Sequence, residues 1–91
     1  MVKYYYVFLE RRYNMAEYKD GFFQYNSQTN RFMIVGRDMF ELSCGYCFQI
    51  ELNNEYVDTR IEINPTTDEW YLVGVGQNIY DLIGYRVKYI Y

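Results

Sequence analysis

The sequence predicts a mainly β protein that forms a small antiparallel barrel or rolled sheet of about five to six strands, with one short N-terminal helix. Short apolar runs recur along the chain at intervals of about ten residues, and clusters of turn-forming residues separate them. The chain has 91 residues, which is enough for one hydrophobic core but not for a second lobe. We therefore expect a single domain over residues 1–91.

The first segment, residues 1–20, is expected to be an N-terminal extension of this domain. It begins with strand-like composition, whereas Leu9, Tyr13 and Ala16 recur at helical spacing among charged residues. We interpret the extension as a strand or extended piece followed by the short helix. The pattern leaves open which of the two dominates.

The barrel-like core, residues 21–91, is expected to begin with a hairpin. The aromatic run at residues 22–25 and the apolar run at residues 31–35 flank five polar residues that favour turns. Residues 40–42 would add a short extension before the next turn.

The next hairpin is the element that the sequence determines best. Residues 47–52 and residues 55–63 alternate between apolar and polar, and Asn53-Asn54 between them supplies two residues that tolerate positive φ. A two-residue turn sets a register in which the apolar positions of both strands share the core face. The predicted cross-strand pairs are Leu52 with Glu55, Ile50 with Val57, Phe48 with Thr59, Glu51 with Tyr56 and Gln49 with Asp58.

The last third of the chain adds two more strands. Residues 69–75 form a run rich in β-branched and aromatic residues, so we expect a buried strand with Trp70 in the core. Residues 76–84 form a crossing segment. Residues 85–91 then close the chain as a strand that carries its basic residues on one side only.

The composition excludes several classes of enzyme. The chain has no histidine, which removes the commonest general base and the commonest metal ligand. Its two serines therefore have no histidine to activate them, and a hydrolase triad is ruled out. We expect that the protein is not an enzyme.

Cys44 and Cys47 form a C-x-x-C motif, the spacing of half a zinc site or of a redox pair. No other cysteine and no histidine can complete a set of four ligands, so zinc would need two chains to meet at this turn. A redox pair would lie at a helix N-terminus, whereas this motif precedes a predicted strand. We therefore interpret both residues as packing cysteines and expect neither a metal nor a cofactor.

Charge is unevenly distributed along the chain. The net charge is −3, but residues 38–69 hold eight acidic residues and one arginine. In the predicted hairpin, strand parity places Glu51, Tyr56, Asp58 and Glu62 on the face away from the core. This acidic face is either a solvated surface of the sheet or a surface that binds a basic protein partner, with the tyrosine as an amphipathic anchor.

Thirteen tyrosines are a second unusual feature. Most are expected to pack in the core or at sheet edges, and exposed ones would suit a protein interface. The alternative is a platform that stacks the bases of single-stranded nucleic acid beside Arg11, Arg12, Arg31 and Arg37. The net negative charge weighs against it, because a protein that neutralises phosphates normally carries an excess of cations.

Several short motifs occur in an order that is typical of one family. The most specific are Thr59-Arg60-Ile61-Glu62 and Trp70-Tyr71-Leu72. The others are Gly21-x-x-x-Tyr25-Asn26, Arg31-Phe32, Leu42-x-Cys44-Gly45, Phe48-x-Ile50, Tyr56-Val57 and Leu82-x-Gly84-x-x-Val87. Over residues 21–88 the chain resembles a family of small β-rich domains of unknown function, found mostly on phages, plasmids and conjugative elements of low-GC Gram-positive bacteria. The resemblance implies a mobile-element context and carries over no catalytic residue.

These features predict a non-enzymatic protein-binding module. Because small acidic proteins of mobile elements are often inhibitors, the resemblance implies an anti-CRISPR-like inhibitor of a nucleic-acid-binding defence nuclease, acting through the acidic face. The alternatives are a small β-barrel that binds single-stranded nucleic acid through tyrosines and arginines, and an accessory domain without a ligand. The sequence shows no secretory or membrane-spanning segment, so we expect a cytoplasmic protein.

Overall fold

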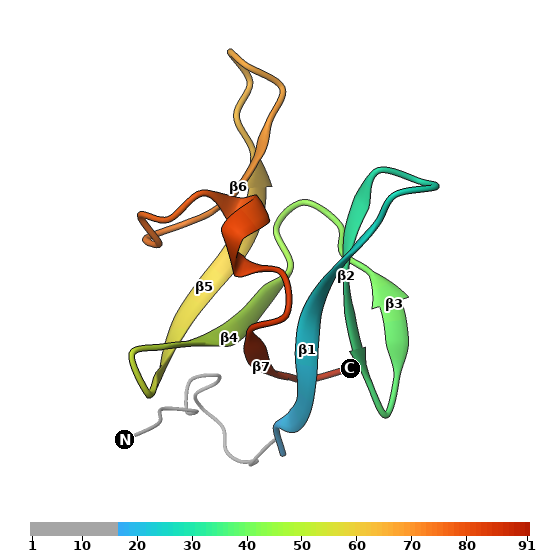
Figure 1. Ribbon diagram of the computed structural model, residues 1–91, viewed down its shortest axis with the longest axis vertical. Helices are drawn as coiled ribbons and strands as arrows, with labels where there is room; N and C mark the ends of the chain where they lie inside the picture. Colours follow the sequence, from blue (N-terminus) through green and yellow to red (C-terminus); the bar gives the residue numbers. More distant parts are fainter. Residues whose placement is uncertain (1–16) are drawn as a thin grey trace.

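The computed structural model describes residues 17–91, which form one antiparallel sheet and a short 3-10 helix (Figure 1). The strands are β1 (Lys19–Asn26), β2 (Arg31–Gly36), β3 (Met39–Glu41), β4 (Cys47–Leu52), β5 (Glu55–Ile63), β6 (Trp70–Leu72) and β7 (Arg86–Tyr89), and the 3-10 helix is η1 (Ile79–Leu82). Their order across the sheet is β3-β2-β1-β7-β4-β5-β6. The last strand therefore lies in the middle of the sheet, between the first strand and the β4–β5 hairpin.

The prediction of a mainly β protein is confirmed, but two of its details are wrong. The sheet has seven strands rather than five or six, because the chain reverses at Arg37-Asp38 and residues 39–41 pair with β2 as a strand of their own. The sheet is also not closed into a barrel. Its edge strands, β3 and β6, are each three residues long and do not pair with each other. Closure would need a ladder between these two edges.

The predicted N-terminal helix is not supported. Residues 1–16, on which most of it falls, lie outside the described residues, and the chain enters β1 at Lys19. The part of the chain that the structure describes contains no α-helix, and so no helix there could cross a membrane.

Although it is open, the sheet curls so strongly that strands far apart in its order touch. The guanidinium carbon of Arg31 in β2 lies 5.8 Å from the centre of the Trp70 ring in β6. The rings of Phe40 in β3 and Tyr89 in β7 are 5.5 Å apart, although β2 and β1 lie between their strands in the order. The sheet thus encloses its own core.

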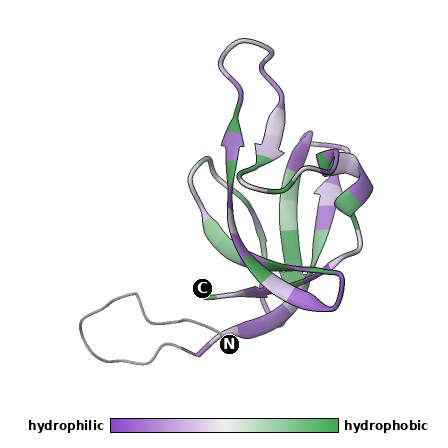
Figure 2. Cartoon of the chain, turned by 90° about the vertical axis from the view of Figure 1, so that its left-hand side faces the viewer, coloured by the Kyte–Doolittle hydropathy of each residue, from purple (hydrophilic) through white to green (hydrophobic). Residues whose placement is uncertain are grey.

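The hydrophobic core lies inside this curl. Its buried side chains are Phe23, Phe32, Ile34, Leu42, Phe48, Ile50, Ile61, Leu72, Ile79, Leu82, Val87 and Tyr89. Figure 2 shows hydrophobic stretches along the strands that surround the core, whereas the projecting β5–β6 hairpin is largely hydrophilic at its tip. Trp70, which was expected in the core, is only half-buried and packs at its margin.

The β4–β5 hairpin confirms its predicted register pair by pair. Its partners are Leu52–Glu55, Ile50–Val57, Phe48–Thr59, Glu51–Tyr56 and Gln49–Asp58, with Cys47–Arg60 beyond them. Asn53 and Asn54 have φ angles of 53° and 67°, the left-handed conformation that a type I′ turn requires. One face of this hairpin therefore packs in the core, and the other points away from it.

Candidate functional site

The outer face of the β4–β5 hairpin, which we define by Glu51, Tyr56, Asp58 and Glu62, is the first candidate surface. The register places all four predicted side chains on the side of the hairpin that points away from the core. Asp58 is exposed, and the other three are partly exposed. The structure therefore brings these residues together on one surface of two neighbouring strands.

Basic side chains from β7 lie beside the outer face. Arg86 approaches Glu51, with 3.9 Å between Nε and Oε1. Lys88 lies 5.0 Å from the centre of the Tyr56 ring and donates a hydrogen bond to Asp20 at 2.7 Å. Sequence reasoning missed this proximity, because only the strand order puts β7 next to β4. The outer face is therefore a mixed surface of carboxylates and cations rather than a purely acidic one.

A buried amide lies beside the outer face. Gln49 is 3% exposed and donates from Nε2 to Oδ1 of Asp58 at 3.0 Å. Its Oε1 has no hydrogen-bond partner among residues 17–91. Because an amide is neutral, this bond orients the Asp58 carboxylate without cancelling its charge. Asp58 makes no ion pair within residues 17–91, which sets it apart from Glu51 and Glu62.

Glu62 is the most closely partnered carboxylate of the outer face. Arg60 donates from Nε to its Oε2 at 2.8 Å, and the Cys44 thiol donates to its Oε1 at 3.0 Å. The hydrogen bond from Cys44, followed by the one from Arg60, lowers the pKa of Glu62. The same thiol–carboxylate bond raises the pKa of Cys44, which disfavours the thiolate, the nucleophilic form of a cysteine.

The two cysteines are exposed, which corrects their interpretation as packing residues. The turn that carries them is bonded to β5 through the N–H of Gly45 and the carbonyl of Tyr46, and it is the Tyr46 ring that packs against the core. Within residues 17–91, no group of three or more Asp, Glu, Cys or His side chains is placed to hold a metal ion. That the protein binds no zinc stays a prediction, which elemental analysis of the purified protein would check.

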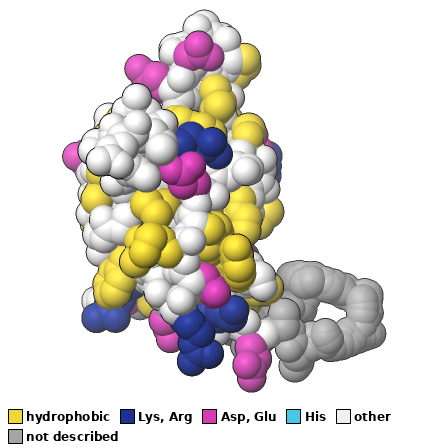
Figure 3. Space-filling model, turned by 90° about the vertical axis from the view of Figure 1, so that its right-hand side faces the viewer, with side chains coloured by type: hydrophobic (Ala, Val, Ile, Leu, Met, Phe, Trp, Pro, Cys, Tyr) yellow, Lys and Arg dark blue, Asp and Glu magenta, His cyan; other side chains and the backbone are white. Residues whose placement is uncertain are grey.

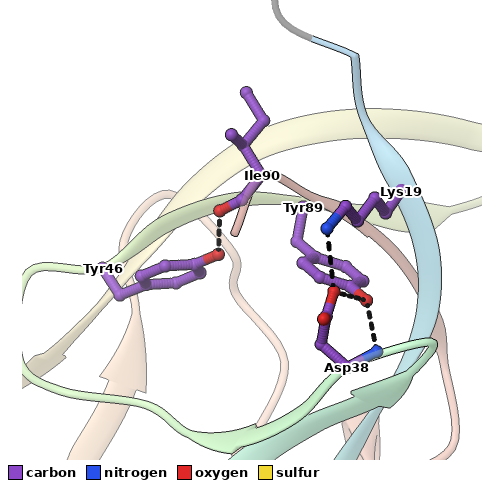
Figure 4. A network of polar contacts seen from close by, with 5 residues as sticks. All are labelled: Lys19, Asp38, Tyr46, Tyr89 and Ile90. Atoms are coloured by element: carbon purple, nitrogen blue, oxygen red, sulfur yellow. Dashed lines mark hydrogen bonds and ion pairs between the residues drawn. The ribbon is translucent and has the colours of Figure 1, made fainter.

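A second group of side chains lies where β1 begins and β2 and β7 end. We call Lys19, Asp38, Tyr46, Tyr89 and Ile90 the Asp38 cluster (Figure 4). The Tyr89 hydroxyl donates to Oδ2 of Asp38 at 3.0 Å and accepts the Asp38 backbone N–H at 3.2 Å. Lys19 donates to the same carboxylate oxygen at 3.0 Å, and the Tyr46 hydroxyl donates to the Ile90 carbonyl at 2.7 Å. The hydroxyl, ammonium and carboxylate groups of this cluster are all paired, which is typical of a structural network.

The Asp38 cluster also shifts the acidity of its members. Burial raises the pKa of Tyr46 to about 12, and the nearby Tyr89 and Asp38 act in the same direction. The hydrogen bond from Lys19 lowers the pKa of Asp38, although partial burial of the carboxylate opposes that effect. Both shifts favour the protonation states that make the hydrogen bonds of the cluster.

The arginines of the nucleic-acid alternative are not brought together. Arg31 is the first residue of β2 and Arg37 follows its last residue, so the length of the strand separates them. Arg11 and Arg12 lie outside the described residues. Arg31 lies against the Trp70 ring instead, and it donates from Nη2 to the carbonyl of Leu42 at 2.7 Å.

Comparison with known proteins identifies relatives of the whole sheet. A family model described as a domain of unknown function (DUF5348) matches residues 21–89. A crystal structure of a protein from Ruminococcus gnavus, from the Northeast Structural Genomics Consortium, is 34% identical in sequence with a TM-score of 0.61. That similarity covers 77% of this chain and 99% of the other. None of the curated proteins compared with the chain matches it.

Proposed function

The chain belongs to the family of the DUF5348 domain of unknown function, and on that premise we propose that it is a non-enzymatic module that binds a protein partner stoichiometrically through the outer face. The partner would present a basic surface, as a protein that binds nucleic acid does. In its most specific form the proposal is an inhibitor of a bacterial defence nuclease, which the resemblance to domains of mobile elements supports.

One observation carries the proposal, namely that three carboxylates and a tyrosine share one face of two adjacent strands. Glu51, Asp58 and Glu62 project from a hairpin whose opposite side is fixed in the core, so their positions relative to one another are rigid. Tyr56 lies in the same row and offers a large contact area at low cost in conformational entropy. A rigid row of charges of this kind is suited to electrostatic recognition of a complementary surface.

Binding would work by exchange of ionic partners. Arg86 and Arg60 now neutralise Glu51 and Glu62, but both arginines are more than half exposed and their ion pairs contribute little to folding. A basic partner can therefore replace them without unfolding the sheet. Asp58 pairs with no cation within residues 17–91 and would supply the first unpaired charge for the approaching partner. Affinity is then expected to fall as salt rises, because exposed charges are screened beyond about 10 Å at 0.1 M salt.

The test is affinity capture from a bacterial lysate on three immobilised proteins. They are the wild type, a variant with Glu51→Lys, Asp58→Lys and Glu62→Lys, and a control with Glu55→Lys, Asp68→Lys and Glu69→Lys. The control changes the net charge by the same amount, but its three positions lie outside the outer face and are exposed. A partner of the outer face is retained by the wild type and the control and is lost from the first variant.

Two further measurements sharpen this test. Tyr56→Ala is expected to raise the dissociation rate of the captured partner, as a desolvated anchor should, while the charge reversals mainly slow association at low salt. If the outer-face variant retains every protein that the wild type retains, the outer face is only a solvated surface. A mobility shift of single-stranded DNA at physiological salt would instead support the nucleic-acid alternative.

A further inference from the structure

A partly exposed aromatic surface lies at the other end of the β1–β2 hairpin from the Asp38 cluster. We call Tyr25, Arg31, Trp70 and Tyr80 the Tyr80 patch; they come from β1, β2, β6 and η1. The rings of Tyr25 and Tyr80 meet edge to face with centres 5.5 Å apart, and both rest on Phe32 of the core at 4.8 and 5.2 Å. Trp70 belongs to β6, which contacts η1, and the guanidinium carbon of Arg31 lies 5.8 Å from its ring centre. The patch is therefore assembled on a rigid base.

The Tyr80 patch exposes hydrophobic side chains to solvent. Tyr80 is 55% exposed, and Tyr25 and Trp70 are partly exposed. Ile63, the direct cross-strand neighbour of Trp70, is 36% exposed and extends the same surface. Figure 3, which looks onto the side of β2 and β3, likewise shows hydrophobic side chains uncovered between charged ones. Several exposed hydrophobic side chains gathered on one side of a small protein are typical of a binding site.

Two hydrogen-bond donors of the patch have no acceptor within residues 17–91. Nε of Arg31 is buried and makes no hydrogen bond there. The side chain of Trp70 makes no hydrogen bond within the described part of the chain, although the indole N–H is a donor that normally finds a partner. Because Nε of Arg31 is buried, the donor available to a ligand is the indole N–H of the partly exposed Trp70. The patch therefore combines aromatic faces with one such donor, which suits a ligand that has apolar rings and free carbonyl oxygens.

We propose that the Tyr80 patch binds a proline-rich segment of a partner protein in the polyproline conformation, with basic residues next to the prolines. Proline rings pack flat against aromatic side chains, and a polyproline segment makes no internal hydrogen bonds, so its carbonyls are free to accept from Trp70. A bound helix would already have used its carbonyls. An added β-strand would need one continuous free strand edge, whereas this patch is built from four separate elements.

The charges around the patch determine the character of the ligand. Glu69 and Asp81 directly adjoin Trp70 and Tyr80 in sequence, are exposed, and form no ion pair or side-chain hydrogen bond within residues 17–91. Unpaired carboxylates attract the arginines or lysines of a peptide. They repel the phosphates of a nucleic acid, which would otherwise be the competing ligand for exposed tyrosines beside an arginine.

The experiment uses the fact that Trp70 is the single tryptophan of the chain, so its fluorescence reports directly on the patch. The probe is a synthetic peptide of Pro-Pro-x-Pro repeats flanked by arginines, titrated into the full-length protein. We expect a saturable change in Trp70 emission. Tyr80→Ala should weaken binding by about ten-fold or more, as the loss of an aromatic anchor does. A peptide with alanine in place of proline, or glutamate in place of arginine, should also bind more weakly.

Tyr71→Ala is the matched control. Tyr71 is adjacent to Trp70 and 43% exposed, but it pairs with Glu62 and so points to the opposite side of β6. It should leave peptide binding unchanged, as should the triple lysine variant of the outer face, because the two sites lie on different faces. No saturable emission change, equal effects of Tyr71→Ala and Tyr80→Ala, equal binding of the alanine peptide, or tighter binding of single-stranded oligothymidine would each overturn the proposal.

Discussion

The two ends of the β1–β2 hairpin use aromatic and basic side chains in opposite ways. In the Asp38 cluster, Tyr89 is fully buried and its hydroxyl both donates and accepts, with Lys19 paired to the same carboxylate. In the Tyr80 patch, Tyr80 is more than half exposed, and Nε of Arg31 has no hydrogen-bond partner within residues 17–91. The same residue types thus stabilise the fold at one end and leave aromatic surface exposed at the other. The difference between Tyr89 and Tyr80 is one of burial, because a buried hydroxyl must find its partners within the fold.

The largest expected difference between the two ends is in stability. Tyr89→Ala should lower the free energy of unfolding by about 3–5 kcal/mol, because it leaves a cavity and unpaired polar groups around Asp38. Tyr80→Ala should lower it by only about 1 kcal/mol, because the ring is 55% exposed and loses mainly its contacts with Tyr25 and Phe32. Urea unfolding followed by circular dichroism measures both. Equal losses would mean that the Tyr80 patch is also a structural cluster.

The second expected effect is a loss of stability when Gly36, which lies next to the Asp38 cluster, is replaced. A Cβ at Gly36 would lie 2.5 Å from the carbonyl oxygen of Asp20 and 3.1 Å from the hydroxyl of Tyr89, so a backbone strand or the cluster must shift. Gly36→Ala should therefore cost about 1–3 kcal/mol of unfolding free energy. Gly76→Ala is the control, because a Cβ added there would meet nothing within 4 Å, and it should be close to neutral. If the two variants unfold at the same urea concentration, the tight packing at this end is not required.

The third expected effect is a loss of stability at alkaline pH. Folding raises the pKa of Tyr46 from 10.0 to about 12, so the folded state keeps a proton that the unfolded chain loses. This contribution to stability is complete below pH 10 and is lost as the pH rises through about 12. Thermal unfolding at a series of pH values should show the loss in the wild type, and Tyr46→Phe should reduce it. A Tyr46→Phe variant with an unchanged alkaline profile would place the responsible phenol elsewhere.

The smallest effect is expected at acid pH. Folding lowers the pKa of Asp38, chiefly through the hydrogen bond from Lys19. The contribution of this carboxylate to stability is therefore complete above the ordinary carboxyl pKa of about 4. It is lost as the pH falls through the lowered pKa of the folded state. Asp38→Asn should be less stable than the wild type near neutral pH, and this difference should shrink in acid. Urea unfolding at both pH values tests it, and a difference that stays constant with pH would contradict it.

The sequence pattern predicted the structure correctly where a strand pairs with the strand that follows it directly in the chain. The register of the β4–β5 hairpin was predicted pair by pair, because strict alternation and two asparagines that tolerate positive φ leave one arrangement that buries the apolar face. For the same reason Glu51, Tyr56, Asp58 and Glu62 were predicted to share a face. The resemblance to a domain family of unknown function is confirmed by the family match over residues 21–89.

What local patterns could not decide is which strands meet across the sheet. The sequence determined the mainly β class, the β1–β2 hairpin, and the register and core face of the β4–β5 hairpin. Only the tertiary structure inserted β7 between β1 and β4, which brings Arg86 beside Glu51, and curled the sheet so that Arg31 reaches Trp70 without closing a barrel. The physical reason is that a two-residue period specifies a face but not a partner, whereas strand order is settled by the packing of the whole core.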